Sequence, residues 1–166
     1  MCKKRCFLIG HREAPESILT PLQKAIETQI LEYGVTEFIV GKYGNFDRLA
    51  ARALLHAKKK HPGLTLSLLL PYLSEKGQAG CPKGFDGTVY PEGLETVPRR
   101  FAIAAANRFM MDHVQALIAY VCHPASNAQK LVEEARRRAR RGEIQIFLWD
   151  PAANAFSEET PMNQRI

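Results

Sequence analysis

The sequence lacks any apolar run that approaches the roughly 20 residues a membrane-spanning helix needs. Its start, MCKKRCFLIGHREAPE, carries charges, and its apolar segment is short and is interrupted by the polar residues 11–13. That pattern is not typical of a signal peptide. These absences predict a cytoplasmic protein with no membrane partner.

Cysteine pairs with the spacing of a metal or redox site are also missing. The four cysteines, at positions 2, 6, 81 and 122, form no CxxC pair and have no matched histidine spacing. We therefore expect scattered buried or free thiols, without a disulfide and without a metal site.

What is present is the composition of one globular domain, since 46% of the 166 residues are hydrophobic and 24% are charged. The net charge of +6 favours anionic ligands, nucleic acid included. Much of this excess lies in two runs, 58–60 and 136–141, each at the end of an expected helix. Because the helix dipole also favours cations there, solvated helix ends are the alternative explanation.

Short apolar runs alternate with helical periodicity, and no internal repeat is evident. Strands are expected at 6–10, 37–41, 64–71, 116–122 and 144–149, and helices at 16–33, 46–57, 99–113 and 126–139. Continuous apolar strands that alternate with helices are typical of a parallel sheet covered on both faces. The sequence therefore predicts the α/β class: a Rossmann-like, doubly wound, mainly parallel five-stranded sheet with helices on both faces.

Residues 1–150 are expected to form this single domain. From 72 to 98 the periodicity disappears and prolines and glycines crowd in, which indicates a loop insertion. Residues 151–166 are interpreted as a weakly ordered tail. In the first helix, Thr20-Pro21-Leu22-Gln23 has the form of a capping box with proline at the first helical position.

In such a fold, ligands bind where strands end and helices begin. Gly41 and Gly44 allow a positive φ, and Asn45 can cap the following helix. Together they could present N–H groups to a phosphate or sugar, or could form only a tight turn. Ser126 or Asn127 can cap the last helix in the same way.

Charged side chains are dense at these strand-to-helix junctions. Arg12 could bind a phosphate, and Glu13 could accept ribose hydroxyls or act as a general base, unless both lie in a solvated loop. Asp47 lies in the first turn of its helix, where the dipole alone would favour a carboxylate. A polar strip on the helix at 99–113, either a binding surface or only a wet face, consists of Arg100, Asn107 and Arg108.

Six segments of the sequence also resemble a known protein family. The segments CFLIGHRE, FIVGKYGNFDRLAARAL, LLLPY, YPEGLETVPRRFAI, ANRFMMDH and LIAYV, in this order, resemble the YpsA-like family of the SLOG superfamily. That superfamily groups the DNA-processing protein DprA with the Lonely Guy enzymes. The likeness runs from residue 6 to about residue 148, and the chain resembles the short clostridial-type members of the family.

The resemblance implies a Rossmann-like fold and a small nucleotide or nucleotide-derived ligand of the AMP, NAD or ADP-ribose type, with no certain cofactor. Paired helices in related folds suggest a homodimer. The family motifs fall, position by position, on Gly10, His11, Arg12, Gly41 or Gly44, Phe46, Asp47, Asn107 and Arg108.

Two departures bear on activity. Lonely Guy enzymes share a Pro-Gly-Gly-x-Gly-Thr-x-x-Glu loop, whereas this chain has PASNAQKLVEE, in which the glutamate register falls on Val132, one residue before Glu133. In many family members Ser-Asp follows the Arg/Asn helix, and here Val114-Gln115 stands in its place.

Three functions stay open from the sequence. The first is a domain that binds or senses a nucleotide at the carboxyl ends of the strands. The second is a phosphoribohydrolase or ribosyl-transfer enzyme on a nucleoside monophosphate, with Glu13 or Glu133 as the catalytic carboxylate. The third is a single-stranded DNA-binding protein resembling DprA, with bases stacked on Tyr43, Tyr72 or Tyr90.

Overall fold

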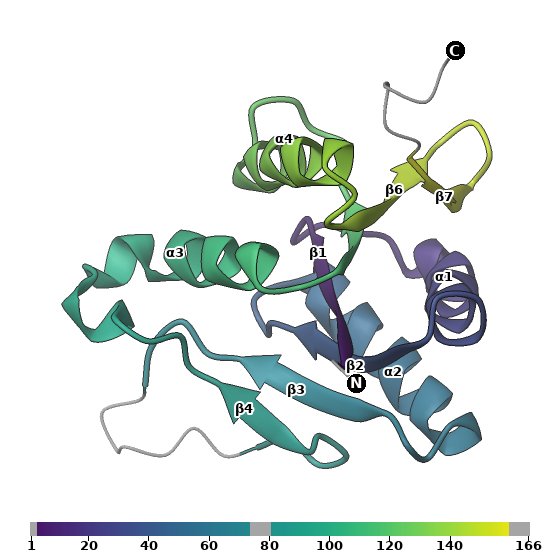
Figure 1. Cartoon of the computed structure of the whole chain (residues 1–166), viewed down its shortest axis with the longest axis horizontal. Coiled ribbons are helices and arrows are strands. Elements are labelled where there is room, and N and C mark those ends of the chain that lie inside the picture. The colour runs from purple at the N-terminus through teal and green to yellow at the C-terminus, as the bar shows by residue number, and fades with distance from the viewer. Residues whose placement is uncertain (1–2, 74–80, 160–166) are drawn as a thin grey trace.

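The structure is a computed structural model that describes residues 3–73 and 81–159. Within these ranges the chain forms one sheet with the strand order β4-β3-β2-β1-β5-β6-β7 (Figure 1). The strands are β1 (Lys4–Gly10), β2 (Val35–Val40), β3 (Thr65–Leu69), β4 (Gly87–Val89), β5 (Ala116–Tyr120), β6 (Gln145–Asp150) and β7 (Ala155–Glu158). Neighbouring strands pair in parallel, except that β7 is antiparallel to β6.

Helices cover both faces of this sheet. They are α1 (Leu19–Leu31), α2 (Asn45–Lys60), α3 (Arg99–Asp112) and α4 (Asn127–Arg140), with short 3-10 turns at Glu16–Ile18 and Leu94–Thr96. α1 and α2 lie on one face, and α3 and α4 lie on the other (Figure 1). The predicted α/β class is confirmed, although the described sheet has seven strands where the sequence predicted five.

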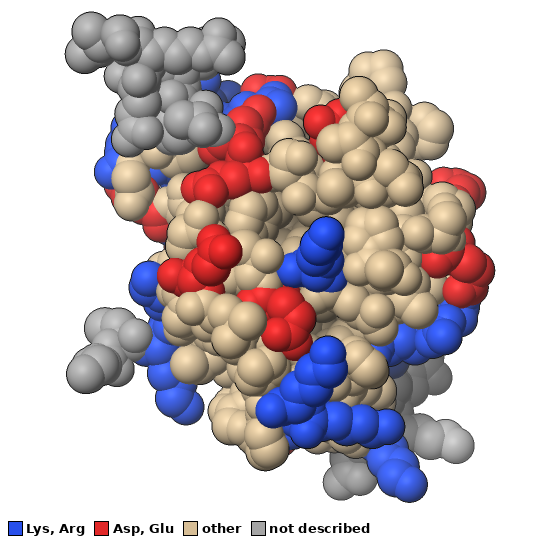
Figure 2. Space-filling model, turned by 90° about the vertical axis from the view of Figure 1, so that its right-hand side faces the viewer, with Lys and Arg blue, Asp and Glu red and all other residues tan. Residues whose placement is uncertain are grey.

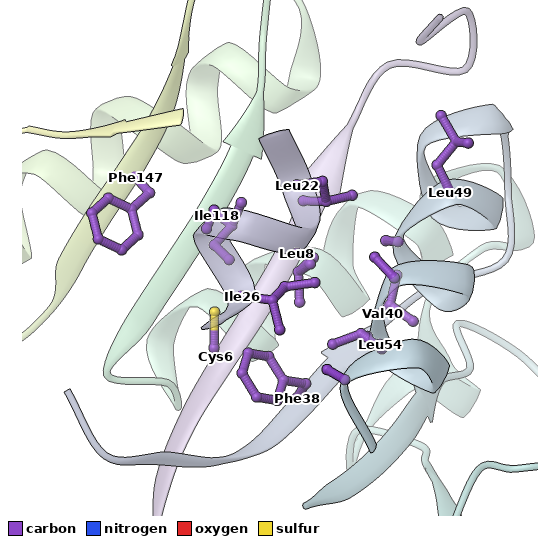
Figure 3. Close-up of a cluster of buried hydrophobic side chains, with 14 of the residues drawn as sticks. Cys6, Leu8, Leu22, Ile26, Phe38, Val40, Leu49, Leu54, Ile118 and Phe147 are labelled. Carbon is purple, nitrogen blue, oxygen red and sulfur yellow. The ribbon is translucent and has the colours of Figure 1, made fainter. Parts of the chain in front are cut away.

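The pleat of the strands divides the core into two clusters. In β1, Leu8 packs in the cluster under α1 and α2, whereas Phe7 and Ile9 pack in the cluster under α3 and α4. Figure 3 shows the first cluster, in which Ile26 of α1 lies over Phe38 of β2. Full burial of a side chain of this size contributes about 1.5–3 kcal/mol. The two clusters hold the strand ends, and therefore the junctions that follow them, in fixed positions.

The start of α1 differs from the predicted capping box. The chain already turns in the 3-10 segment before the helix, and Ile18 occupies the N-cap without a side-chain hydrogen bond. Thr20 is therefore inside the helix, and Pro21 lies in its first turn, where a missing N–H costs no hydrogen bond. The capping-box prediction is wrong, because the buried Ile18 rather than a threonine hydroxyl marks the start.

β4 forms within the segment predicted to be a loop insertion. Its start is fixed by Asp86, whose carboxylate accepts the backbone N–H of Leu66 at 2.8 Å and pairs with Lys58. The three residues of β4 are half-buried or exposed, so no apolar run marks them in the sequence. Residues 74–80 of the insertion lie outside the described residues.

β7 forms within the segment predicted to be a weakly ordered tail. Phe156 of β7 packs against Trp149 of β6, with ring centroids 5.2 Å apart, and Asn154 supports the intervening turn with a φ of 49°. The prediction of a weakly ordered tail is therefore wrong for residues 155–158, because one aromatic pair and an antiparallel ladder fix this strand. Residues 160–166 lie outside the described residues.

Candidate functional site

The strand order reverses its direction between β1 and β5, which places a crevice at the carboxyl ends of these two strands. A cavity of about 330 Å³ lies there. It brings together ten of the residues selected from the sequence: Gly10, His11, Arg12, Glu13, Gly41, Tyr43, Asp47, Asn107, Ser126 and Asn127. Three strand-to-helix junctions and α3 therefore contribute to one cavity.

His11 connects the first junction to the third. Its Nε2 accepts the backbone N–H of Cys122 at 2.7 Å and lies 3.3 Å from the N–H of His123. An accepting Nε2 requires the neutral ring with its proton on Nδ1. Burial lowers the pKa of His11, the nearby His123 lowers it further, and Glu13 opposes this shift. His11 is thus a neutral side chain that fixes the end of β1 to the end of β5.

Asn45 connects the first junction to the second. Its backbone N–H donates to the carbonyl of Arg12 at 3.0 Å, and its side-chain amide donates to the carbonyl of Ala14. The N-cap of α2 is Gly44, without a side-chain hydrogen bond, so the expected capping role of Asn45 is wrong. The side-chain amide of Asn45 bonds to the loop after β1 instead of capping α2, because the two junctions lie in direct contact.

The glycines at the junctions permit close approach. A Cβ at Gly44 would lie 2.7 Å from the Cα of Arg12, and a Cβ at Gly10 would overlap the ring of Phe46. Gly44 has a φ of 158° and a ψ of −177°, and Gly41 has no positive φ. The positive φ that the sequence allowed is therefore present at Gly44 and absent at Gly41, and the close contact with Arg12 is a second reason for a glycine at position 44.

Gly10→Ala tests this packing. We expect the free energy of unfolding to fall by about 1–3 kcal/mol, because the added methyl group must displace the Phe46 ring. In a Phe46→Ala background the same change is expected to cost far less, and urea denaturation of the four proteins of the cycle measures the difference. Gly63→Ala is the control, since nothing lies within 4 Å of a Cβ built there. An equal cost in both backgrounds would contradict the explanation.

Asp47 is a half-buried acid that lines the cavity. Its Oδ2 accepts the backbone N–H of Tyr43 at 2.9 Å, which holds the turn between β2 and α2. Burial raises the pKa of Asp47 to about 6, while the bond from Tyr43 and the positive charge of Arg12 oppose the rise. The structure therefore keeps a carboxyl group beside the cavity at a cost in folding free energy.

The start of α4 supplies the positive end of a helix dipole. Ser126 is the N-cap and accepts the backbone N–H of Gln129 at 3.1 Å, so the predicted cap is confirmed for this serine. Ala125 before it has a φ of 64°. Ser126, Asn127 and Ala128 line the cavity, so the free amide groups of the first turn border it.

Several selected residues lie outside this cavity. They are Gly44, Asn45, Phe46, Arg100, Arg108 and Glu133. Arg108 pairs with Glu134 of α4 at 3.2 Å, and its side chain is 66% exposed. Arg100 is exposed, and its guanidinium carbon lies 4.8 Å from the centre of the Phe101 ring. Of the polar strip on α3, the structure brings only Asn107 into the cavity.

The two candidate catalytic carboxylates are not brought together. Glu13 lines the cavity, whereas Glu133 pairs with Arg136 and accepts the side-chain amide of Gln129 at 2.9 Å. The side chain of Glu133 is 49% exposed, on the polar face of α4. The cavity therefore contains one of the two acids that the enzyme hypothesis named.

Sequence reasoning missed the apolar wall of the cavity. The additional lining residues are Phe7, Leu8, Ile9, Leu69, Pro71, Ile103, Ala106, Ala128 and Leu131. In the sequence these residues are indistinguishable from core residues, because a strand or helix stripe does not show which of its members borders a cavity. The apolar positions 103 and 106 of α3 could have indicated this wall from the sequence, since they adjoin the selected residue Asn107.

Part of each basic run is engaged within the fold. Lys58 pairs with Asp86, and Arg136 pairs with both Glu133 and Glu159. On the face seen in Figure 2, basic and acidic side chains are interspersed. Among residues 3–73 and 81–159 no group of three His, Cys, Asp or Glu side chains could hold a metal ion, and none of the helices there is long and apolar enough to cross a membrane.

Comparisons with known proteins give a structural likeness but no sequence match. No protein-family model matches the chain, and no curated protein sequence matches it. Among solved structures, the chain is similar to the structure of the Moco Carrier Protein from Chlamydomonas reinhardtii. The sequences are 16% identical, the match covers 92% of this chain and 80% of that one, and the TM-score is 0.49.

Proposed function

We propose that the chain binds a nucleotide or a nucleotide-derived ligand in the cavity at the carboxyl ends of β1 and β5. One observation carries this proposal: Arg12 and the first turn of α4 border the same cavity. A phosphate is the ligand group that fits both, because it accepts charge-assisted hydrogen bonds from arginine and from the free amides of a helix start.

The rest of the cavity suits a sugar and a base. Asp47 and Glu13 provide carboxylates that can accept hydrogen bonds from ribose hydroxyls, as acidic residues do in Rossmann folds. A cavity of about 330 Å³ lies at the small end of the range for ligand pockets, roughly 300–1,000 Å³. This size favours a mononucleotide such as AMP over NAD or ADP-ribose.

Binding is favoured over glycosidic hydrolysis because of the placement of the acids. Glu13 borders the cavity as an exposed side chain, while Glu133 is engaged by Arg136 outside it. A glycosidase uses two carboxylates on opposite sides of the bond that breaks. In this chain the second carboxylate would have to be Asp47, which is held by the Tyr43 N–H.

Thermal unfolding against a ligand panel tests the proposal. The panel contains AMP, ATP, NAD, ADP-ribose, a cyclic dinucleotide and a short single-stranded oligonucleotide. A ligand at about 100 times its dissociation constant stabilises the folded state by about 2.7 kcal/mol, which shifts the midpoint by several degrees. We expect this shift with a mononucleotide. A shift with the oligonucleotide alone, removed by salt, would contradict the cavity site and support nucleic-acid binding.

Two substitutions at Ser126 distinguish its proposed role beside the phosphate from its role as the cap of α4. Ser126→Ala is expected to lower the free energy of unfolding by about 1 kcal/mol, because α4 loses its cap. Ser126→Asp keeps a capping oxygen, so stability is expected to stay near that of the original chain. The same aspartate places a negative charge at the proposed phosphate position, and calorimetric titration should show mononucleotide binding weakened by about tenfold or more. Unchanged binding in Ser126→Asp would contradict a phosphate at this position.

A further inference from the structure

The cavity has two chemically different ends. Arg12, Ser126 and Asn127 lie at the junctions after β1 and β5. Tyr43, Leu69 and Pro71 lie at the ends of β2 and β3, on the other side of β1 in the sheet order. The end at α4 is therefore rich in N–H donors, and the end at β2 and β3 combines aromatic and apolar side chains with the Asp47 carboxyl. Arg12 lies between them, against the turn that follows Tyr43.

Tyr43 is held at the aromatic end by groups from two other elements. Its ring centroid lies 6.1 Å from that of Tyr72, which follows β3. The guanidinium carbon of Arg99, the first residue of α3, lies 4.2 Å from the centre of the Tyr72 ring. This arrangement is a cation–π pair that supports a second ring, and it restricts the positions open to Tyr43.

The hydroxyl of Tyr43 stays protonated at neutral pH. Burial raises the pKa of this group, and the neighbouring Tyr72 raises it further. The backbone N–H of Tyr43 is separately bound to Asp47, so the main chain is fixed independently of the ring. A side-chain substitution at Tyr43 can therefore change the aromatic surface without removing the bond that holds the turn.

Asn107 lines the same cavity. It comes from the middle of α3 together with the apolar Ile103 and Ala106. An asparagine amide carries both a donor and an acceptor, which is the combination that pairs with the edge of a nucleobase. The Tyr43 ring and the Asn107 amide, which border one cavity, suit a planar heteroaromatic ring.

We propose that the aromatic end of the cavity is a nucleobase subsite, in which Tyr43 stacks on the base of a nucleoside monophosphate and Asn107 binds its edge. Tyr72 and Arg99 are positioning residues that hold Tyr43. This inference rests on the proposed function, since the phosphate at Arg12 and Ser126 sets the direction of the ligand. The inference adds to the proposed mononucleotide site the residues that bind the base.

Isothermal titration of the full chain with two kinds of probe tests the subsite. The probes are the four monophosphates AMP, GMP, CMP and UMP, and ribose 5-phosphate, which has the same phosphate and sugar without a base. We expect the best monophosphate to bind about 5- to 150-fold more tightly than ribose 5-phosphate, as one base stack is worth about 1–3 kcal/mol. Tyr43→Ala should remove this advantage, and Tyr43→Phe should keep it.

Variants of Arg99 test the positioning role separately. Arg99→Ala is expected to weaken monophosphate binding about threefold without changing ribose 5-phosphate binding, and Arg99→Lys should recover part of the loss because a cation still lies over Tyr72. A general loss of structure would instead change both probes together, and thermal unfolding of each variant detects it.

Each outcome decides between the two proposals. Equal affinity for monophosphates and ribose 5-phosphate, or an unchanged affinity in Tyr43→Ala, overturns the base subsite and leaves the phosphate site standing. An equal loss for both probes in Tyr43→Ala also overturns it, because the residue would then act on the turn rather than on a base. If neither kind of probe binds the original chain, the proposed function and this inference both fail.

Discussion

Arg12→Ala is expected to weaken mononucleotide binding by about 10- to 100-fold, because a hydrogen bond to a charged group contributes about 1.5–3 kcal/mol. The backbone of Arg12 accepts the Asn45 N–H, and alanine keeps that bond. The fold is therefore expected to tolerate the change, and the loss should appear in binding rather than in the free energy of unfolding. Arg12→Lys should retain part of the affinity, since lysine supplies a charge without the planar fork.

Arg108→Ala is the matched control for this experiment. Both arginines were selected from the sequence, but Arg108 lies outside the cavity and pairs with Glu134 on the surface. An exposed ion pair contributes little, roughly 0–1 kcal/mol, so this variant should bind and unfold almost as the original chain does. Calorimetric titration with AMP compares the three proteins. Equal losses in Arg12→Ala and Arg108→Ala would contradict a phosphate site at the end of β1.

Asp47→Asn is expected to stabilise the protein above neutral pH. The pKa of this carboxyl rises from 3.8 to about 6 on folding, mainly because it is buried. One pKa unit corresponds to about 1.4 kcal/mol, so the charged form costs on the order of 2–3 kcal/mol at pH 7 and above. Asparagine removes the charge and keeps an oxygen that accepts the Tyr43 N–H.

The sign of the pH dependence follows from the same shift. Because the folded protein binds this proton more tightly than the unfolded chain does, the carboxyl lowers stability as pH rises from 3.8 to about 6. The advantage of Asp47→Asn should therefore be complete above that range and should vanish below it. His11 has the opposite effect, since its lowered pKa reduces stability as the solution becomes acidic. Comparing the two proteins at each pH cancels the histidine contribution.

Urea denaturation of both proteins across this pH range measures the effect. We also expect Asp47→Asn to reduce the stabilisation that a mononucleotide provides, because the amide replaces an acceptor of ribose hydroxyls. A more stable protein that binds less well is the behaviour expected of a residue retained for a site. A variant that is less stable above neutral pH would contradict the conclusion that burial of the charge dominates.

The fold could be predicted because the sequence patterns that mark its main strands and helices extend over many residues. The five principal strands are nearly continuous apolar runs, and the stripe from Phe46 to Ala57 occupies one face of α2. β4 escaped prediction because its start depends on Asp86 and Lys58, which are far apart in the sequence. β7 escaped prediction because it has four residues, of which only Phe156 is a large apolar side chain, so no apolar run marks it.

The site could be predicted at the level of junctions but not of individual roles. Periodicity placed His11 and Asn45 after strands, and the carboxyl ends of parallel strands meet at one edge of the sheet. Which loop each side chain would join depended on backbone groups such as the Cys122 N–H and the Ala14 carbonyl. On α3, helical spacing grouped Arg108 with Asn107, but the position of α4 turned only Asn107 toward the cavity and gave Arg108 a partner in Glu134.

Amide chemical shifts of the isotope-labelled full chain, recorded during titration with AMP, test the central claim most directly. The largest changes are expected at Gly41, Tyr43, Asn127 and Ala128, which line the cavity near the ends of β2 and β5. The amides of Lys58 to Lys60, at the far end of α2, should stay unchanged. Shifts that follow the basic runs, or no saturable shift at the cavity, would contradict a mononucleotide site between these strands.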